Sequence, residues 1–130
     1  MAETLESKSD SRLRVRGAVR GDAATVLSLI RELAEYERLL DHVTATEADI
    51  DRLLFAPDAR AFCDLAEWDG VPVGFAFWCY NVSTFRGRHG IYLEDLYVQP
   101  GLRGHGIGKA CGAVACFDSA PRVATPTAAE

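Results

Sequence analysis

The segment DLYVQPGLRGHGIGKA, residues 95–110, places three glycines on alternate positions just after Arg103. Glycine has no Cβ, so successive glycines let backbone N–H groups approach a bulky anion closely. The first N–H groups of a helix are unpaired and lie at its positive end. A strand, a glycine loop and a helix in this order are therefore typical of a diphosphate cradle. The glycines alone are equally consistent with a flexible turn that binds nothing.

Two common phosphate-binding patterns do not fit this loop. The Walker pattern needs Gly-Lys followed by Ser or Thr, whereas Gly108 and Lys109 are followed by Ala110. The dinucleotide pattern G-x-G-x-x-G also fails, because Gly104 to Gly108 form G-x-G-x-G and no acidic residue follows on a second strand. Both failures count against a nucleotide-binding regulatory domain.

Two adjacent carboxylates, Glu94 and Asp95, precede the loop on a strand-like run. A primary ammonium must lose a proton before it can act as a nucleophile, and a carboxylate in a partly desolvated cleft can accept that proton. Neighbouring residues of a strand point to opposite faces, so only one carboxylate can enter the cleft. We expect Glu94 to do so. A purely structural role for both carboxylates stays open.

A second acidic group lies near residue 37, where Glu35, Glu37 and Asp41 would form a rim suited to a polyamine. Tyr36 lies within this rim, although a tyrosine at the edge of the core beside a solvated Glu37 is equally consistent. The chain carries 19 acidic and 14 basic residues, a net charge of −5. This balance favours a small cationic partner over nucleic acid or an anionic membrane.

Periodic apolar residues predict the elements that hold these groups in place. Leu13 and Val15 alternate with arginines, as in a half-buried strand, and Val26, Ile30 and Leu33 recur at helical spacing. An α+β layer sandwich follows from the order of elements. We expect a strand over 12–19, a helix over 23–37 capped by Asp22, a short helix between Thr46 and Pro57 with a capping pair of Thr46 and Asp49, a hairpin over 61–80 that turns at Asp69 and Gly70, a loop over 81–90, a strand over 91–98, the glycine loop and a last helix.

The pattern Arg-x-x-Gly-x-Gly over residues 103–108, directly after YLEDLYVQP, resembles the coenzyme A loop of the GCN5-related N-acetyltransferases (GNAT). LIRELAEYERLLDHV, the Thr-Glu-x-Asp helix start, GFAFWCY and IYLEDLYV resemble the diamine (spermidine/spermine or thialysine) acetyltransferase branch of that family. The resemblance covers about residues 12–111. It implies an acyl-CoA N-acyltransferase fold, with a mixed, mostly antiparallel sheet flanked by helices.

The resemblance also implies an activity and a set of site residues. It implies acetyl transfer from acetyl-CoA, as cosubstrate, to a primary amine of a small polyamine, diamine or thialysine-like substrate. Glu94 would be catalytic, and Tyr36, Glu37 and Glu94 would bind the amine. We expect the Val98 N–H to stabilise the oxyanion. The His105 side chain could contact phosphate, but we expect it to face solvent, because loops are surface features. The residues implied in acetyl-CoA binding are Leu96, Tyr97, Val98, Arg103, Gly104, His105, Gly106, Ile107, Gly108 and Lys109.

The resemblance stops near Cys111, where family members continue with further strands, a helix and a tyrosine that protonates the departing thiolate. The tyrosines here are Tyr36, Tyr80, Tyr92 and Tyr97. We therefore expect a flexible N-terminus over 1–11, a partial acetyltransferase domain over 12–118 and a disordered tail over 119–130, with truncation or a changed frame after about residue 111. The alternative is a non-catalytic remnant that only binds coenzyme A or a protein partner.

Further features of the sequence concern the membrane, the cellular compartment and metal binding. No apolar run reaches the length of about 20 residues that a membrane span needs, and the polar, acidic N-terminus is unlike a signal peptide. The four cysteines show no C-x-x-C spacing, so we expect free thiols in a reducing cytoplasm and no metal site. A homodimer stays open.

Overall fold

The computed structural model describes residues 4–7, 10–111 and 128–129, and it describes side chains over residues 12–111. Short 3-10 turns occur at Leu40–His42 and Pro100–Leu102, and residues 107–111 are helical. The remaining elements are β1 (Thr4–Ser7), β2 (Asp10–Gly17), α1 (Ala23–Tyr36), α2 (Glu47–Phe55), β3 (Ala61–Trp68), β4 (Val71–Ser83), β5 (Arg88–Val98) and β6 (Ala128–Ala129).

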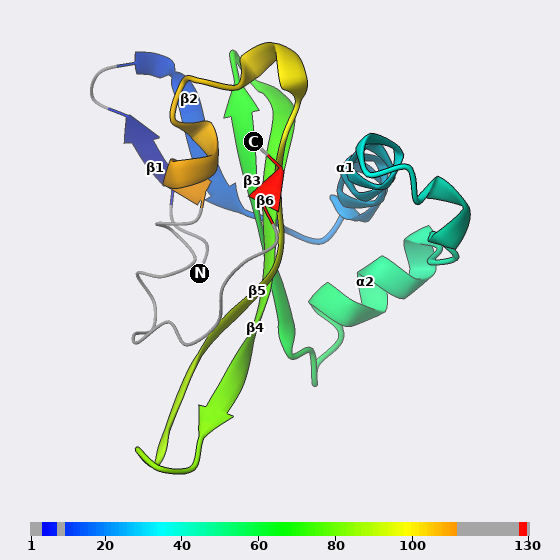
Figure 1. Cartoon of the computed structure of the whole chain (residues 1–130), viewed down its shortest axis with the longest axis vertical. Coiled ribbons are helices and arrows are strands. Elements are labelled where there is room, and N and C mark those ends of the chain that lie inside the picture. The colour runs from blue at the N-terminus through cyan, green and yellow to red at the C-terminus, as the bar shows by residue number, and fades with distance from the viewer. Residues whose placement is uncertain (1–3, 8–9, 112–127, 130) are drawn as a thin grey trace.

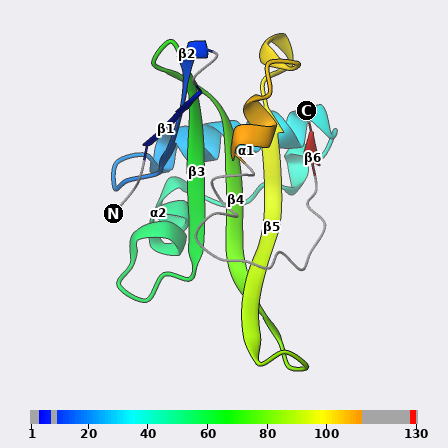
Figure 2. The ribbon, with the colours of Figure 1, turned by 90° about the vertical axis from the view of Figure 1, so that its left-hand side faces the viewer.

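The strands form one sheet in the order β1-β2-β3-β4-β5-β6. All neighbours are antiparallel except β5 and β6, which are parallel, so the predicted mixed, mostly antiparallel sheet is confirmed. Figure 1 shows α1 and α2 together on one face of the sheet. Figure 2 shows the opposite face, with the turn of helix that follows the glycine loop lying in front of the sheet near β5. The helices described are too short or too polar to cross a bilayer.

Each face of the sheet has its own apolar core. On the face covered by α1 and α2, Val26 and Leu33 pack with Leu65, Phe75 and Tyr97 from the strands. This explains the helical spacing of apolar residues in the sequence, because one stripe of α1 must meet the sheet. We call this group the helix-side core. The opposite group, the loop-side core, includes Val15, Trp78, Ile91, Val98 and Ile107.

Local sequence determines the turn and cap that were predicted. Asp69 and Gly70 join β3 to β4 with φ angles of 52° and 80°, which is the left-handed pair that a type I′ hairpin turn requires. The capping box at α2 is present in both directions. The Asp49 N–H donates to Thr46 Oγ1 at 3.2 Å, and the Thr46 N–H donates to Asp49 Oδ2 at 2.8 Å.

Two boundaries differ from the prediction. The first strand ends at Gly17, so Val19 lies outside it and is 52% exposed. Most of the loop predicted over 81–90 is strand, because the ladder continues through Val82–His89 and Ser83–Arg88 pairs. Only residues 84–87 form the turn. Gly87 has a φ of +65°, a left-handed conformation that glycine adopts readily.

The described residues near both chain ends pair with the sheet. Thr4–Ser7, within the predicted flexible N-terminus, pairs with β2 as an antiparallel strand. The edge of β2 otherwise carries unpaired N–H and C=O groups, which is the physical reason for such pairing. Most of the predicted tail lies outside the described residues, while Ala128–Ala129 pairs with β5.

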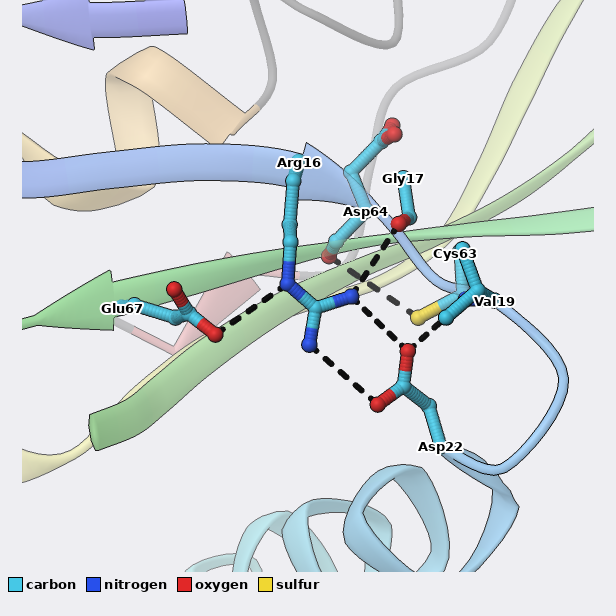
Figure 3. Close-up of polar contacts among 7 residues, drawn as sticks. All are labelled: Arg16, Gly17, Val19, Asp22, Cys63, Asp64 and Glu67. Carbon is cyan, nitrogen blue, oxygen red and sulfur yellow. Dashed lines mark hydrogen bonds and ion pairs between the residues drawn. The ribbon is translucent and has the colours of Figure 1, made fainter. Parts of the chain in front are cut away.

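Arg16 joins the sheet to the start of α1 (Figure 3). Its guanidinium donates to Asp22 at 2.8 and 3.2 Å and to Glu67 Oε2 at 3.1 Å. Asp22 precedes α1 as predicted, but its side chain makes no capping hydrogen bond to the helix. The carboxylate instead accepts from Arg16 and from the Val19 N–H at 2.7 Å, and the Arg16 hydrogen bond holds the pKa of Asp22 below its ordinary value.

Candidate active site

The glycine loop leaves the end of β5 through the Pro100–Leu102 turn and leads into the helical residues 107–111. Gly104 and Gly106 have φ angles of +90° and +74°, a region that side-chain-bearing residues rarely adopt. A Cβ at either position would meet no heavy atom within 4 Å, so both backbones are open to an approaching group. This arrangement fits an extended anionic ligand, because outside the neighbouring residues no atom obstructs the approach to either glycine.

The far end of the loop is fixed in the core. Ile107 is fully buried in the loop-side core, and the Ala110 N–H donates to the Gly106 carbonyl at 3.0 Å, which forms the first helical turn. Gly108 is buried, whereas Lys109 is exposed. Loop residues 104–106 thus span between two anchored ends.

His105 lies on the outside of the loop. Its side chain is exposed, and its ring lies against Trp68 with ring centres 4.9 Å apart. The Arg12 guanidinium also lies over Trp68, 4.8 Å from the ring centre. His105 therefore contacts the end of β3, in agreement with the interpretation of His105 as a surface residue.

Arg103 turns inward from the loop. Its Nε donates to the Val98 carbonyl at 3.0 Å, and its guanidinium carbon lies 4.4 Å from the ring centre of Tyr36 and 6.0 Å from that of Tyr97. The side chain therefore contacts β5 and the end of α1. No local sequence pattern indicates this contact between the loop and α1.

The two adjacent carboxylates have different surroundings because of a β-bulge. The partners of β5 step from Asp95–Phe77 to Leu93–Trp78, which leaves Glu94 without a partner on β4. Glu94 is exposed. Asp95 is half-buried and lies on the same face as its partner Phe77, which packs against the helix-side core.

The position of Asp95 changes its titration. Burial, followed by the charges of Glu94 and Glu37, raises the pKa of Asp95 to about 6. Asp95 is thus electrostatically coupled to Glu37, the residue that directly follows α1. Sequence reasoning favoured Glu94 and gave Asp95 no functional role, because simple alternation does not show which carboxylate faces the helices beside a bulge.

A polar cluster joins the end of β5 to α1. The Tyr97 hydroxyl donates to Glu32 Oε1 at 3.2 Å, and Gln99 Nε2 donates to the same oxygen at 3.0 Å. Burial and then Glu32 raise the pKa of Tyr97. This cluster holds the start of the glycine loop at a defined distance from α1. It escaped sequence reasoning because Glu32 lies 65 and 67 positions from its two partners.

The outer edge of β5, which faces away from β4, is the edge that a ligand of the loop would reach. The Gln99 N–H donates to Val73 of β4 at 2.9 Å. Successive N–H groups of a strand alternate in direction, so the Val98 N–H points to the outer edge. Leu96 and Tyr97 pair there with Ala128 and Ala129 of β6.

Solved acetyltransferases share this fold. An aminoglycoside acetyltransferase from an uncultured soil metagenomic sample, solved in complex with sisomicin, superposes with a TM-score of 0.74 at 16% identity, covering 95% of this chain and 82% of that one. An aminoglycoside N-acetyltransferase solved in complex with CoA gives a TM-score of 0.63 at 21% identity, covering 88% and 76%. The predicted acyl-CoA N-acyltransferase fold is confirmed.

Residues 26–115 match the Acetyltransferase (GNAT) family, and the chain belongs to that family. It is 41% identical over 103 residues to a thialysine N-epsilon-acetyltransferase of Bos taurus, covering 73% of this chain and 60% of that protein. It is 35% identical over 102 residues to a spermidine/spermine N(1)-acetyltransferase-like protein 1 of Homo sapiens, covering 73% and 14%. The chain thus spans about 60% of the length of the thialysine acetyltransferase.

Proposed function

We propose that this protein binds acetyl-CoA along the glycine loop and the outer edge of β5 and transfers its acetyl group to a primary amine of a small polyamine, diamine or thialysine-like substrate. The observation that carries the proposal is the loop itself, in which Gly104 and Gly106 take left-handed conformations with open backbones. Relatives named as thialysine acetyltransferases support the choice of amine.

The residues of the loop fit the phosphate-bearing part of the cofactor. The N–H groups of residues 104–109 would hold the diphosphate, and the backbone of Leu96, Tyr97 and Val98 would hold the pantetheine arm in the manner of an added strand. The cofactor supplies an acyl thioester when bound. In the structure the Arg103 side chain contacts Val98 and Tyr36.

The amine site lies between the end of α1 and β5. Tyr36 is the last residue of α1 and Glu37 follows it, while Glu94 and Asp95 come from β5. Glu37 is close enough to Asp95 to raise its pKa. Three carboxylates in one region attract a cationic substrate. Glu94 would accept the proton of the amine directly or through one water, and Asp95 would bind a cationic group of the substrate from the helix side.

The Val98 N–H would stabilise the oxyanion that forms when the amine attacks the thioester. This N–H points to the outer edge of β5, in the direction of the proposed pantetheine site. Holding the amine and the thioester against the same strand would supply much of the acceleration.

A second candidate function is binding of coenzyme A or a protein partner without transfer. One observation favours it: the backbone positions Leu96 and Tyr97 are already paired with β6. A ligand that binds this edge must first displace β6. The free energy of the β5–β6 pairing is then subtracted from the binding free energy of the ligand.

Two measurements on the whole chain test the proposal. Calorimetric titration with acetyl-CoA measures binding, and release of free thiol from acetyl-CoA with spermidine, diaminopropane or thialysine measures transfer. The proposal expects both, with the Gly106→Ala variant reduced in both. Binding without thiol release supports the second candidate, and absence of binding by folded protein rejects both.

A further inference from the structure

Arg103 and Tyr36 connect the proposed cofactor loop to the proposed amine site. We propose that Arg103 is a positioning residue which, through its contact with Tyr36, makes binding of the cofactor strengthen binding of the amine. This inference rests on the proposed function. It goes further, because it assigns a coupling between two subsites to one pair of side chains.

The loop end of the connection is a hydrogen bond to the strand. Arg103 Nε donates to the Val98 carbonyl at 3.0 Å, and the Leu102 N–H donates to the Gln99 carbonyl at 3.0 Å just before it. Arg103 is therefore attached to β5, and it directly precedes Gly104, the first open glycine. A shift of residues 104–106 around a bound anion would therefore displace Arg103.

The helix end of the connection is the ring of Tyr36. The guanidinium carbon of Arg103 lies 4.4 Å from the ring centre, within the range of a cation–π contact. Tyr36 is the last residue of α1 and remains 53% exposed, so this contact covers only part of it. The next residue is Glu37, whose charge reaches Asp95. A displacement of Tyr36 therefore moves the carboxylates that would hold the amine.

One hydrogen-bond donor of Arg103 lacks an acceptor within the described part of the chain, which favours a rearrangement of Arg103 and Tyr36 when an anion binds. Nη2 is buried and has no hydrogen-bond partner among the described residues. A buried donor on a charged group without an acceptor is unfavourable. An anion seated in the loop would provide an acceptor, so the guanidinium has different interactions in the free and loaded states. That difference is what a coupling between two ligands requires.

The consequence is a reciprocal coupling that can be measured without turnover. The dissociation constant of spermidine is measured by calorimetry with and without saturating CoA, which carries no acetyl group and cannot react. We expect CoA to lower that constant about five-fold or more in the wild type, as is typical of coupled sites. By thermodynamic linkage, spermidine lowers the dissociation constant of CoA by the same factor.

Variants of Tyr36 separate coupling from folding, because the residue is half exposed. Tyr36→Leu removes the ring, and we expect the coupling factor to fall to about one while CoA alone still binds. Tyr36→Phe keeps the ring and should keep the factor. Tyr92→Leu is the matched control, since Tyr92 is an exposed tyrosine of β5, 41% accessible, opposite Cys79 and outside the loop. Arg103→Gln removes the guanidinium that contacts Tyr36, so it should also abolish the coupling.

The outcomes distinguish the inference from the proposed function. If folded wild-type protein binds no CoA, both are rejected. If it binds CoA and spermidine independently, or if Tyr36→Leu keeps the wild-type coupling factor, only the inference is rejected. If Arg103→Gln does not fold, the three tyrosine variants still decide the matter.

Discussion

Arg16 on β2 holds the carboxylate of Asp22, the residue just before α1, with two hydrogen bonds of 2.8 and 3.2 Å. Both side chains are mostly buried, with 20% and 16% of their surface exposed, and Glu67 of β3 accepts from the same guanidinium. The start of α1 is thereby attached to two strands. The far end of α1 carries Tyr36, so this attachment contributes to the placement of the proposed amine site.

Removing the charge of Asp22 should therefore destabilise the protein. We expect Asp22→Asn to lower the free energy of unfolding by about 1–3 kcal/mol, because it weakens a charge-assisted pair and leaves Arg16 with one carboxylate. Urea unfolding at pH 7, followed by circular dichroism, measures the change. Asp58→Asn is the control, since Asp58 is an exposed acid in the turn after α2.

The same pair predicts a dependence on pH. The pKa of Asp22 is lowered in the folded state, so its stabilisation is present above the ordinary carboxyl pKa and is lost as the pH falls through the folded value. The wild type should lose more stability than Asp22→Asn on acidification from pH 5 toward pH 3. Equal losses in the two proteins would contradict the role assigned to Asp22.

Much of the fold could be predicted from the sequence because local chemistry determines it. Asp69 and Gly70 specify a turn that needs two left-handed residues, and Thr46 and Asp49 cap α2 through their own side chains. The end of the β4–β5 hairpin was predicted less well. Strand pairing there continues through polar residues such as Ser83, which have no apolar alternation to indicate a strand.

The candidate site could be predicted only where its residues are neighbours in the sequence. The glycine loop is a single contiguous segment, so its spacing of glycines after Arg103 indicates a phosphate site directly. The contacts of Arg103 with Tyr36 and of Glu32 with Tyr97 join distant positions, so no local pattern indicates them. The environment of Asp95 depends on a bulge, which shifts register by one residue and leaves no clear pattern in the sequence.

Binding of a cationic amine should depend on the ionisation of Asp95. Because its pKa is about 6, Asp95 is largely protonated at pH 5 and ionised at pH 7. We expect the affinity for spermidine to rise with pH over this interval, with a midpoint near 6 that shifts lower at saturating amine. Calorimetric titration of the whole chain at pH 5.0, 6.0 and 7.0 measures it.

Asp95→Asn should remove most of this pH dependence, while Asp51→Asn, at a half-buried acid on α2, should leave it unchanged.

The pH dependence of stability provides a second measurement of the Asp95 pKa. The folded pKa of Asp95 is raised, so the folded state binds more protons between about pH 4 and 6, and stability falls across that window as pH rises. Asp95→Asn should reduce that fall; an unchanged profile would show that Asp95 is solvated.

Pairing of β6 with β5 should compete with acetyl-CoA. Ala129 pairs with Tyr97, at the edge proposed for the pantetheine arm. Ala129→Pro removes a backbone N–H and disfavours the strand. If that costs the pairing about 1 kcal/mol, acetyl-CoA binding should tighten by about five-fold. Ala129→Val keeps the backbone donor and favours strand geometry, so it should not tighten binding. Equal affinities in the two variants would mean that β6 does not occupy the cofactor edge.

The glycine loop permits a test in which backbone strain is matched. Gly106 and Gly87 have φ angles of +74° and +65°, and a Cβ at either would meet nothing within 4 Å. Alanine at either position should therefore cost a similar amount of folding free energy, about 1–2 kcal/mol, from left-handed geometry alone. Only Gly106 lies in the proposed diphosphate site, so only Gly106→Ala should weaken acetyl-CoA binding, by about ten-fold or more. A methyl group at that position obstructs the approach to the backbone N–H groups.

Thermal melting with and without acetyl-CoA measures both the folding cost and the loss of binding in one experiment. A cofactor-induced shift in melting temperature that is lost in Gly106→Ala but kept in Gly87→Ala is the expected result, and loss of the shift in both, or in neither, would place the cofactor elsewhere.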